Sequence, residues 1–235
     1  YELISNTWSL LPKTAVRRFG MGIINGRLVL VGGTRENFQQ MSTVRILREN
    51  SKSWTRSATI PSMSIARSRP AVVSLATHLV VAGGTLQSET PIKAVEIYDI
   101  ATSQWSTTHQ LPYGCWDLQG TVCNNRIYFI GGYNTEYRLN RVLSAKLDDL
   151  ISTSTFSRDP RNEDKSPNST QVWTENQNTP SYRPSAVTMG SIMLAAGGTD
   201  TADLLQILPA QKLHAYSVSM NSWIPIGDLP ATVAF

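Results

Sequence analysis

The segment Leu28–Gly33 reads LVLVGG, and three similar segments follow it along the chain: Leu79–Gly84 (LVVAGG), Ile127–Gly132 (IYFIGG) and Ile192–Gly198 (IMLAAGG). Each is a short apolar run that ends in a glycine pair. The first glycines of successive pairs lie 51, 48 and 66 residues apart. A period near fifty residues indicates one structural unit copied four times along the chain, with neighbouring copies packed together.

Tryptophan and proline recur in step with the glycine pairs. Each pair is followed by a tryptophan, and a proline stands seven residues after each of these tryptophans: Trp54 and Pro61, Trp105 and Pro112, Trp173 and Pro180, Trp223 and Pro230. In the third unit the tryptophan comes later, because residues 152–171 are inserted before it. This insertion is polar and has no periodicity, so it cannot bury enough apolar surface to offset its ordering entropy. We expect it to be a flexible surface segment.

Within each unit the sequence predicts four short strands. In the second unit they are Pro70–Leu75, Leu79–Ala82, Lys93–Tyr98 and Gln104–Thr108, and His78 falls in the turn before the second strand. The runs are rich in β-branched and aromatic residues, and the mostly short breaks between them favour antiparallel neighbours. The continuous apolar second run predicts a strand that is buried on both faces. Repeated four-stranded sheets are the blade pattern of an all-β propeller.

The repeat residues resemble those of the kelch family, whose marks are an arginine, a glycine pair, a tyrosine and a tryptophan on successive strands. Three arginines lie fourteen residues before the first glycine of their pair: Arg18, Arg69 and Arg183. Tyr98 and Tyr216 lie seven residues before their tryptophans. The chain departs from the pattern at Asp117, where the third unit should have arginine, and at Leu47, where the first should have tyrosine. The resemblance covers all of the chain except the insertion.

The resemblance implies a kelch-type β-propeller with four complete four-stranded blades and partial blades at both ends. We expect a single propeller region over residues 1–235, with blades at about 13–58, 66–108, 117–175 and 183–226, and partial strands at 5–12 and 231–235. Kelch propellers usually close with five to seven blades, most often six, so the chain resembles part of a six-bladed propeller. Alternatively, the two end strands meet and form a reduced closing blade.

Strand alternation predicts which loops share a face. In an antiparallel blade, the loop between the second and third strands emerges on the same side as the connection to the next blade, and such loops commonly carry binding residues. Arginines outnumber lysines by 15 to 6 in the chain. Guanidinium groups suit carboxylate or phosphate recognition, and aromatic rings suit interface anchors. The predicted partner-binding residues on this face are Arg18, Arg35, Arg69, Tyr113, Trp116, Tyr133, Tyr137, Tyr182 and Arg183.

These residues predict a non-catalytic protein-interaction module that binds a partner protein or peptide of acidic or phosphorylated character. An arginine that recurs at one position in three blades could equally bridge neighbouring blades, whereas Trp116 breaks the repeat and favours a role specific to its unit. One alternative, implied by the resemblance, is the substrate-receptor part of a ubiquitin-ligase adaptor. Another is a carbohydrate-active or oxidase-like propeller enzyme.

Composition and motifs exclude several other classes. The net charge is only +4, spread over four units, so we expect no nucleic-acid partner. The apolar runs are far shorter than the roughly 20 residues of a membrane helix, so we expect no membrane association. The three histidines occupy different places in their units, and we therefore predict no metal ligand set and no cofactor. The two cysteines lack a disulfide or metal pattern, which favours a reducing, cytoplasmic location. The sequence leaves the oligomeric state open.

Overall fold

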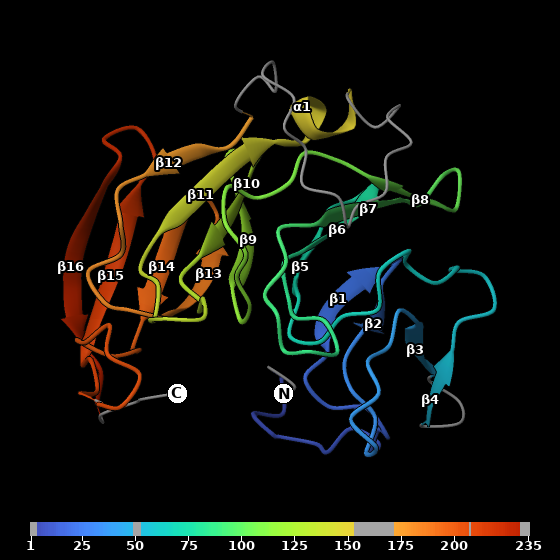
Figure 1. Cartoon of the computed structure of the whole chain (residues 1–235). Coiled ribbons are helices and arrows are strands. Elements are labelled where there is room, and N and C mark those ends of the chain that lie inside the picture. Colours follow the sequence, from blue (N-terminus) through green and yellow to red (C-terminus); the bar gives the residue numbers. More distant parts are fainter. Residues whose placement is uncertain (1–3, 49–52, 153–171, 207, 231–235) are drawn as a thin grey trace.

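The computed structural model describes residues 4–48, 53–152, 172–206 and 208–230. These residues form four antiparallel four-stranded sheets and one short helix (Figure 1). Each sheet contains consecutive strands of one repeat unit, so each sheet is one blade. The predicted all-β blade architecture is confirmed.

The strand bounds follow the repeat. The first blade contains β1 (Gly20–Ile24), β2 (Arg27–Val31), β3 (Val44–Arg48) and β4 (Ser53–Arg56). The second contains β5 (Ala71–Ser74), β6 (His78–Ala82), β7 (Val95–Asp99) and β8 (Gln104–Thr107). The third contains β9 (Gln119–Cys123), β10 (Arg126–Ile130), β11 (Val142–Lys146) and β12 (Thr174–Asn176). The fourth contains β13 (Ser185–Met189), β14 (Ile192–Ala196), β15 (Lys212–Ser217) and β16 (Ser222–Asp228).

The four blades form an arc with the first strand of each blade on the inside (Figure 1). Strand β1 contacts β5, β5 contacts β9, and β9 contacts β13. An open pocket of about 540 Å³ lies along the inner strands and is lined mainly by small and apolar side chains such as Ile23, Val73, Val122 and Val187. The arc therefore has the radial arrangement that defines propeller blades.

The second strand of each blade is central to the packing. In β6, Leu79 and Val81 pack toward the first blade, whereas Val80 packs in the cluster shared with the third blade. All three side chains are fully buried. Alternate residues of a strand point to opposite faces, so a blade between two others needs apolar residues at every position of its second strand. This is why the apolar runs do not alternate with polar residues.

The glycine pairs allow the blades to meet. Gly83 and Gly84 have φ values of 62° and 97°, in the region that glycine adopts without strain. A Cβ atom on Gly83 would lie 2.5 Å from the carbonyl oxygen of Cys115, at the start of the third blade. The N–H of Gly84 donates to that same oxygen at 2.8 Å. A side chain on Gly83 would therefore separate two blades, and a Cβ atom on Gly84 would lie 2.5 Å from the carbonyl oxygen of Ser68 on the connection that enters the same blade.

The recurring tryptophans join each blade to the connection before it. Each indole Nε1 donates a hydrogen bond to a backbone carbonyl of that connection: Trp54 to Pro12 at 2.9 Å, Trp105 to Pro61 at 2.8 Å, Trp173 to His109 at 3.3 Å and Trp223 to Gln177 at 3.1 Å. The recurring tyrosines pack on two of these rings, with centroid separations of 5.2 Å for Tyr98–Trp105 and 4.9 Å for Tyr216–Trp223. The tryptophan hydrogen bonds thus tie each blade to the connection before it, and the tyrosine contacts lie within a blade.

A fully buried ion pair fixes the connection between the first two blades. Arg67, on that connection, pairs with Glu96 on β7, and neither side chain is exposed. Arg67 Nη1 also donates to the carbonyls of Gly83 and Ala94, at 3.0 and 2.8 Å. The second oxygen of the Glu96 carboxylate accepts from the backbone N–H and hydroxyl of Ser64. Both charges therefore have partners, as buried charges require.

Several local predictions need correction. His78 is the first residue of β6 and not part of the preceding turn. Residues 8–12 form no strand, and within 5–12 only Thr7 is in an isolated bridge. A short helix that we did not predict, α1 (Leu147–Ile151), precedes the insertion and buries Leu150 in the core. The insertion beyond residue 152 and the partial strand at 231–235 lie outside the described residues.

Candidate functional site

Every blade presents the same loop frame on one face of the arc. The residue after each glycine pair forms bridges with two segments, namely the incoming connection and the end of its own loop. The bridged triplets are Arg17–Thr34–Gln40, Ser68–Thr85–Pro91, Trp116–Tyr133–Arg138 and Tyr182–Thr199–Pro209. Because the backbone frame repeats, the differences between blades on this face are differences in side chains and in loop length.

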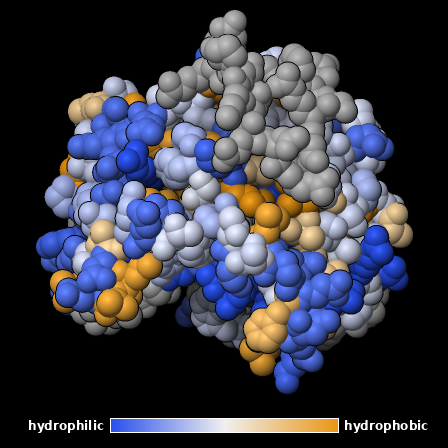
Figure 2. All heavy atoms as spheres, viewed as in Figure 1, coloured by the Kyte–Doolittle hydropathy of each residue, from blue (hydrophilic) through white to orange (hydrophobic). Residues whose placement is uncertain are grey.

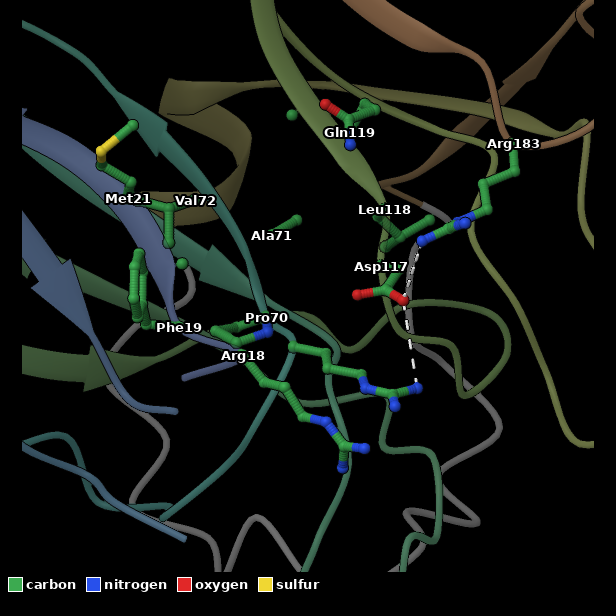
Figure 3. Close-up of a pocket in the computed structure, with 13 residues that line it drawn as sticks. Arg18, Phe19, Met21, Pro70, Ala71, Val72, Asp117, Leu118, Gln119 and Arg183 are labelled. Carbon is green, nitrogen blue, oxygen red and sulfur yellow. Dashed lines mark hydrogen bonds and ion pairs between the residues drawn. The ribbon is translucent and has the colours of Figure 1, made fainter. Parts of the chain in front are cut away.

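Four residues at equivalent positions form a ring around a cavity on this face. They are Arg18, Arg69, Asp117 and Arg183, and we call them the mouth ring. Each directly follows a bridged residue, and all four have left-handed backbone, with φ between 51° and 56°. The cavity that they line measures about 340 Å³ and is also bordered by residues of β1, β5 and β9 (Figure 3). Left-handed backbone costs free energy in residues other than glycine and clusters at functional sites.

The mouth ring also connects the blades through backbone hydrogen bonds. The N–H of Arg69 donates to the carbonyl of Arg18 at 2.6 Å, and the N–H of Asp117 donates to the carbonyl of Arg69 at 3.2 Å. Each bond joins one blade to the next. The left-handed backbone of these residues is thus held in place by the packing of the blades, and the side chains stand on a rigid support.

Ion pairs connect the ring side chains. Asp117 Oδ2 lies 3.4 Å from Arg183 Nη2 and 4.0 Å from Arg69 Nη1, as the dashed lines in Figure 3 mark. Arg18 Nη1 lies 3.0 Å from Glu89 Oε1 on the β6–β7 loop. The side chains of Arg69, Asp117 and Arg183 are 23–28% exposed. The arginines therefore bridge blades, as the alternative interpretation expected, and also border the cavity.

An aromatic stack extends the ring outward. The Arg183 guanidinium lies 4.7 Å from the centre of the Tyr133 ring. Trp116 stacks on Tyr133 with a centroid separation of 5.8 Å and an interplanar angle of 15°. The indole Nε1 of Trp116 is buried without a hydrogen-bond partner among the described residues. Cation–π contact orients the guanidinium plane, so the stack holds Arg183 toward Asp117.

The other predicted residues lie on the same face but do not line the cavity. Tyr113 packs against the Arg141 guanidinium at 5.5 Å, and burial raises the pKa of the Tyr113 phenol above its usual range. Arg35 is exposed on the β2–β3 loop, and Tyr137 is 40% exposed on the β10–β11 loop. Tyr182 is half-buried, with its backbone paired to Thr199. The structure therefore brings together five of the nine predicted residues: Arg18, Arg69, Trp116, Tyr133 and Arg183.

Sequence reasoning missed the role of Arg138. This side chain is 5% exposed and donates to backbone carbonyls of the β14–β15 loop, including Gln206 at 2.9 Å and Leu204 at 3.3 Å. The loop so held carries exposed leucines, among them Leu205 at 94% exposure, and Figure 2 shows apolar residues over this loop at the lower left. The sequence feature that could have indicated this contact is the length of the Thr199–Lys212 loop, which is longer than the equivalent loop in the other three blades.

Two other features are absent from the described part of the chain. Among the residues described, no group of three His, Cys, Asp or Glu side chains is arranged to hold a metal ion. The described residues also contain no helix that is both long enough and apolar enough to span a membrane. The mouth ring and its stack present guanidinium, carboxylate and aromatic groups.

Four sheets stacked around an axis, with a polar ring on one face, define the chain as a β-propeller of repeated blades. A family model for the kelch motif matches residues 66–108, which contain the second blade. The chain is 29% identical to mouse Kelch-like protein 15 over 125 residues, which are 52% of this chain and 20% of that protein. It is 28% identical to Beta-scruin of Limulus polyphemus over 160 residues, or 63% of the chain and 17% of that protein.

A third relative is Kelch domain-containing protein 8B of Pongo abelii, which is 26% identical over 142 residues, or 56% of the chain and 40% of that protein. The matches span less than half the length of each of these relatives. Together with the recurring arginine, glycine, tyrosine and tryptophan contacts, they show that the chain is similar to kelch-repeat proteins.

Proposed function

We propose that the chain is a non-catalytic protein-interaction module, which binds an acidic or phosphorylated segment of a partner at the mouth ring. The kelch-repeat relatives support the coarser part of this proposal, a propeller that interacts with proteins. The acidic character of the partner is inferred from the side chains of the ring.

The observation that carries the proposal is the position of the Asp117 carboxylate between Arg69 and Arg183. These two arginines come from the second and fourth blades, and both reach one carboxylate oxygen of the third. The separations of 4.0 and 3.4 Å are longer than those of a tight charge-assisted hydrogen bond, so the guanidinium groups keep donors for a further acceptor. The ring thus already holds one carboxylate and has the chemistry to hold another.

A peptide array tests this proposal. The purified chain is applied to arrayed peptides that differ in the number of Glu, Asp and phosphoserine residues, and the variants Arg69→Ala and Arg183→Ala are compared with it. Arg27→Ala is the matched control, because Arg27 is exposed at the start of β2, at the end of the blade away from the ring. We expect both ring variants to lose acidic peptides while the control keeps them. Ring variants that bind as the unchanged chain does would refute the proposal.

The same variants separate binding from a purely structural role. Unfolding of each variant is followed in urea, and a cooperative transition near that of the unchanged chain shows that the blades still pack. If both ring variants unfold without denaturant, the arginines hold the blades together and the binding assignment is wrong.

We further propose that residues 1–235 belong to a single six-bladed propeller. The outer blades of the arc each have apolar side chains that no neighbouring blade covers: Met21 and Ile23 on β1 are 55% and 51% exposed, and Val187 and Ile192 on the fourth blade are 59% and 46% exposed. At the equivalent positions of the second blade, Val73 is buried and Val72 and Ser74 are half-buried, so additional blades would cover the exposed apolar side chains. Both cysteines are free and buried, which fits the proposed cytoplasmic location.

A further inference from the structure

Asp117 is the one position of the mouth ring that departs from arginine. It keeps the left-handed backbone of the other three, with φ of 53°, so the blade frame is unchanged and only the side chain differs. In the ring, this change replaces a positive charge with a negative one. Asp117 has two arginine neighbours, whereas Arg18 is directed to Glu89 outside the cavity.

The Asp117 carboxylate is placed where an acidic ligand would bind. A ligand carboxylate or phosphate that enters the cavity needs guanidinium donors, and Arg69 and Arg183 both line the cavity and contact Asp117. Asp117 already neutralises part of their charge and repels a second anion. Repulsion between two like charges that share a partly buried cavity is enough to change affinity about tenfold.

We propose that Asp117 is a specificity-determining residue that competes with acidic ligands for Arg69 and Arg183. This inference rests on the proposed function of the mouth ring. It deepens that function by naming the ligand class: the ring accepts a segment with one isolated carboxylate or phosphate and disfavours a dense cluster of negative charges. If position 117 were arginine, as in the other three blades, the ring would instead favour ligands with clustered negative charges.

The test measures anion binding by the ring directly, with inorganic phosphate as the probe. Phosphate is titrated into the chain labelled with ¹⁵N-arginine, and the side-chain Nε–Hε signals are followed by NMR. The variant Asp117→Asn removes the charge, keeps a side-chain oxygen and suits the left-handed backbone, which asparagine tolerates. Asp117→Gly is the second variant, because glycine adopts this backbone without strain.

We expect both variants to bind phosphate about tenfold more tightly than the unchanged chain, with the largest shifts at Arg69 and Arg183. The matched control is Glu136→Gln, which removes one negative charge from the exposed β10–β11 loop of the same face. Its phosphate affinity should change by less than about twofold, because solvent and salt screen that charge.

Equal or weaker phosphate binding by Asp117→Asn and Asp117→Gly would overturn the proposal, as would an equal gain in the Glu136→Gln control. Absence of phosphate binding in all proteins would overturn it too. These outcomes are distinct from failure of the proposed function, because the titration needs no partner. A peptide array without acidic preference rejects the partner class, whereas an unchanged phosphate affinity rejects the role of Asp117 alone.

Discussion

The substitution Glu96→Ala should strongly destabilise the protein. Glu96 accepts from Arg67 and from both donors of Ser64, and the Glu96 and Arg67 side chains are both 0% exposed. Burial lowers the pKa of the Arg67 guanidinium, and the Glu96 carboxylate opposes that effect by favouring the charged form. Without Glu96, the cost of burying the Arg67 charge is therefore left uncompensated.

The expected loss follows from this geometry. Removing one partner of a buried ion pair typically costs 3–5 kcal/mol. The two carbonyls that accept from Arg67 remain, but the Ser64 N–H and hydroxyl lose their acceptor, so we expect a loss of about 4 kcal/mol. For a chain of this size, about 2–4 °C of melting temperature is lost per kcal/mol, which corresponds to roughly 8–16 °C.

Urea unfolding followed by tryptophan fluorescence measures this loss. Glu175→Ala is the matched control: Glu175 lies on β12 and pairs with Arg141 at 3.1 Å, but its side chain is 51% exposed. Exposed pairs contribute about 0–1 kcal/mol, so the control should unfold near the unchanged chain. If Glu96→Ala loses less than about 1 kcal/mol, the reasoning about the buried pair is wrong.

Three further predictions concern other parts of the molecule. Arg138→Ala should speed amide hydrogen exchange at the β14–β15 loop while the blades keep their protection, and unchanged exchange would show that other contacts hold the loop. Burial raises the pKa of the Cys115 thiol to about 12 and also raises the pKa of the Cys123 thiol. Neither thiol should therefore react with an aromatic disulfide reagent at pH 8 before the protein unfolds. Rapid reaction of both thiols in the native protein would contradict this prediction. Burial lowers the pKa of the His214 imidazole below its ordinary value of 6.5 in the folded protein. As the pH falls below 6.5, the unfolded chain therefore takes up this proton more readily than the folded protein, and the free energy of unfolding should decrease. The free energy of unfolding at pH 5.5 and 7.5, with His214→Gln as control, measures that dependence, and equal slopes in both proteins would refute it.

The fold was predictable because the recurring glycines and tryptophans make contacts that hold the blades together. Gly83 and Gly84 must be glycine where another backbone lies within 2.5 Å of a would-be Cβ, and Trp105 must reach the connection before its blade. Such requirements recur in each copy and are therefore visible in one sequence. Helix α1 was not predictable in this way, because it occurs in one unit only and is five residues long. Its formation depends on burial of Leu150, which is a tertiary contact.

The candidate site was predictable only in part. Strand alternation placed the loops on one face, and the recurring Arg18, Arg69 and Arg183 proved to share one cavity. Which loop residues approach the cavity depends on backbone conformation and on side-chain stacking, so Tyr133 joins the ring through Arg183 whereas Tyr113 pairs with Arg141. A sequence pattern does not contain those distances.

The central claim is that the partner binds the mouth-ring face. The most direct measurement places a photo-cross-linking amino acid at Tyr137, which is exposed on that face, or at Thr102, which is exposed on the β7–β8 turn at the opposite end of its blade. The chain is expressed in cells, irradiated and analysed for covalent adducts. We expect an adduct from position 137 that disappears in the Arg69→Ala background, and none from position 102. Adducts from position 102, with none from position 137, would contradict the account.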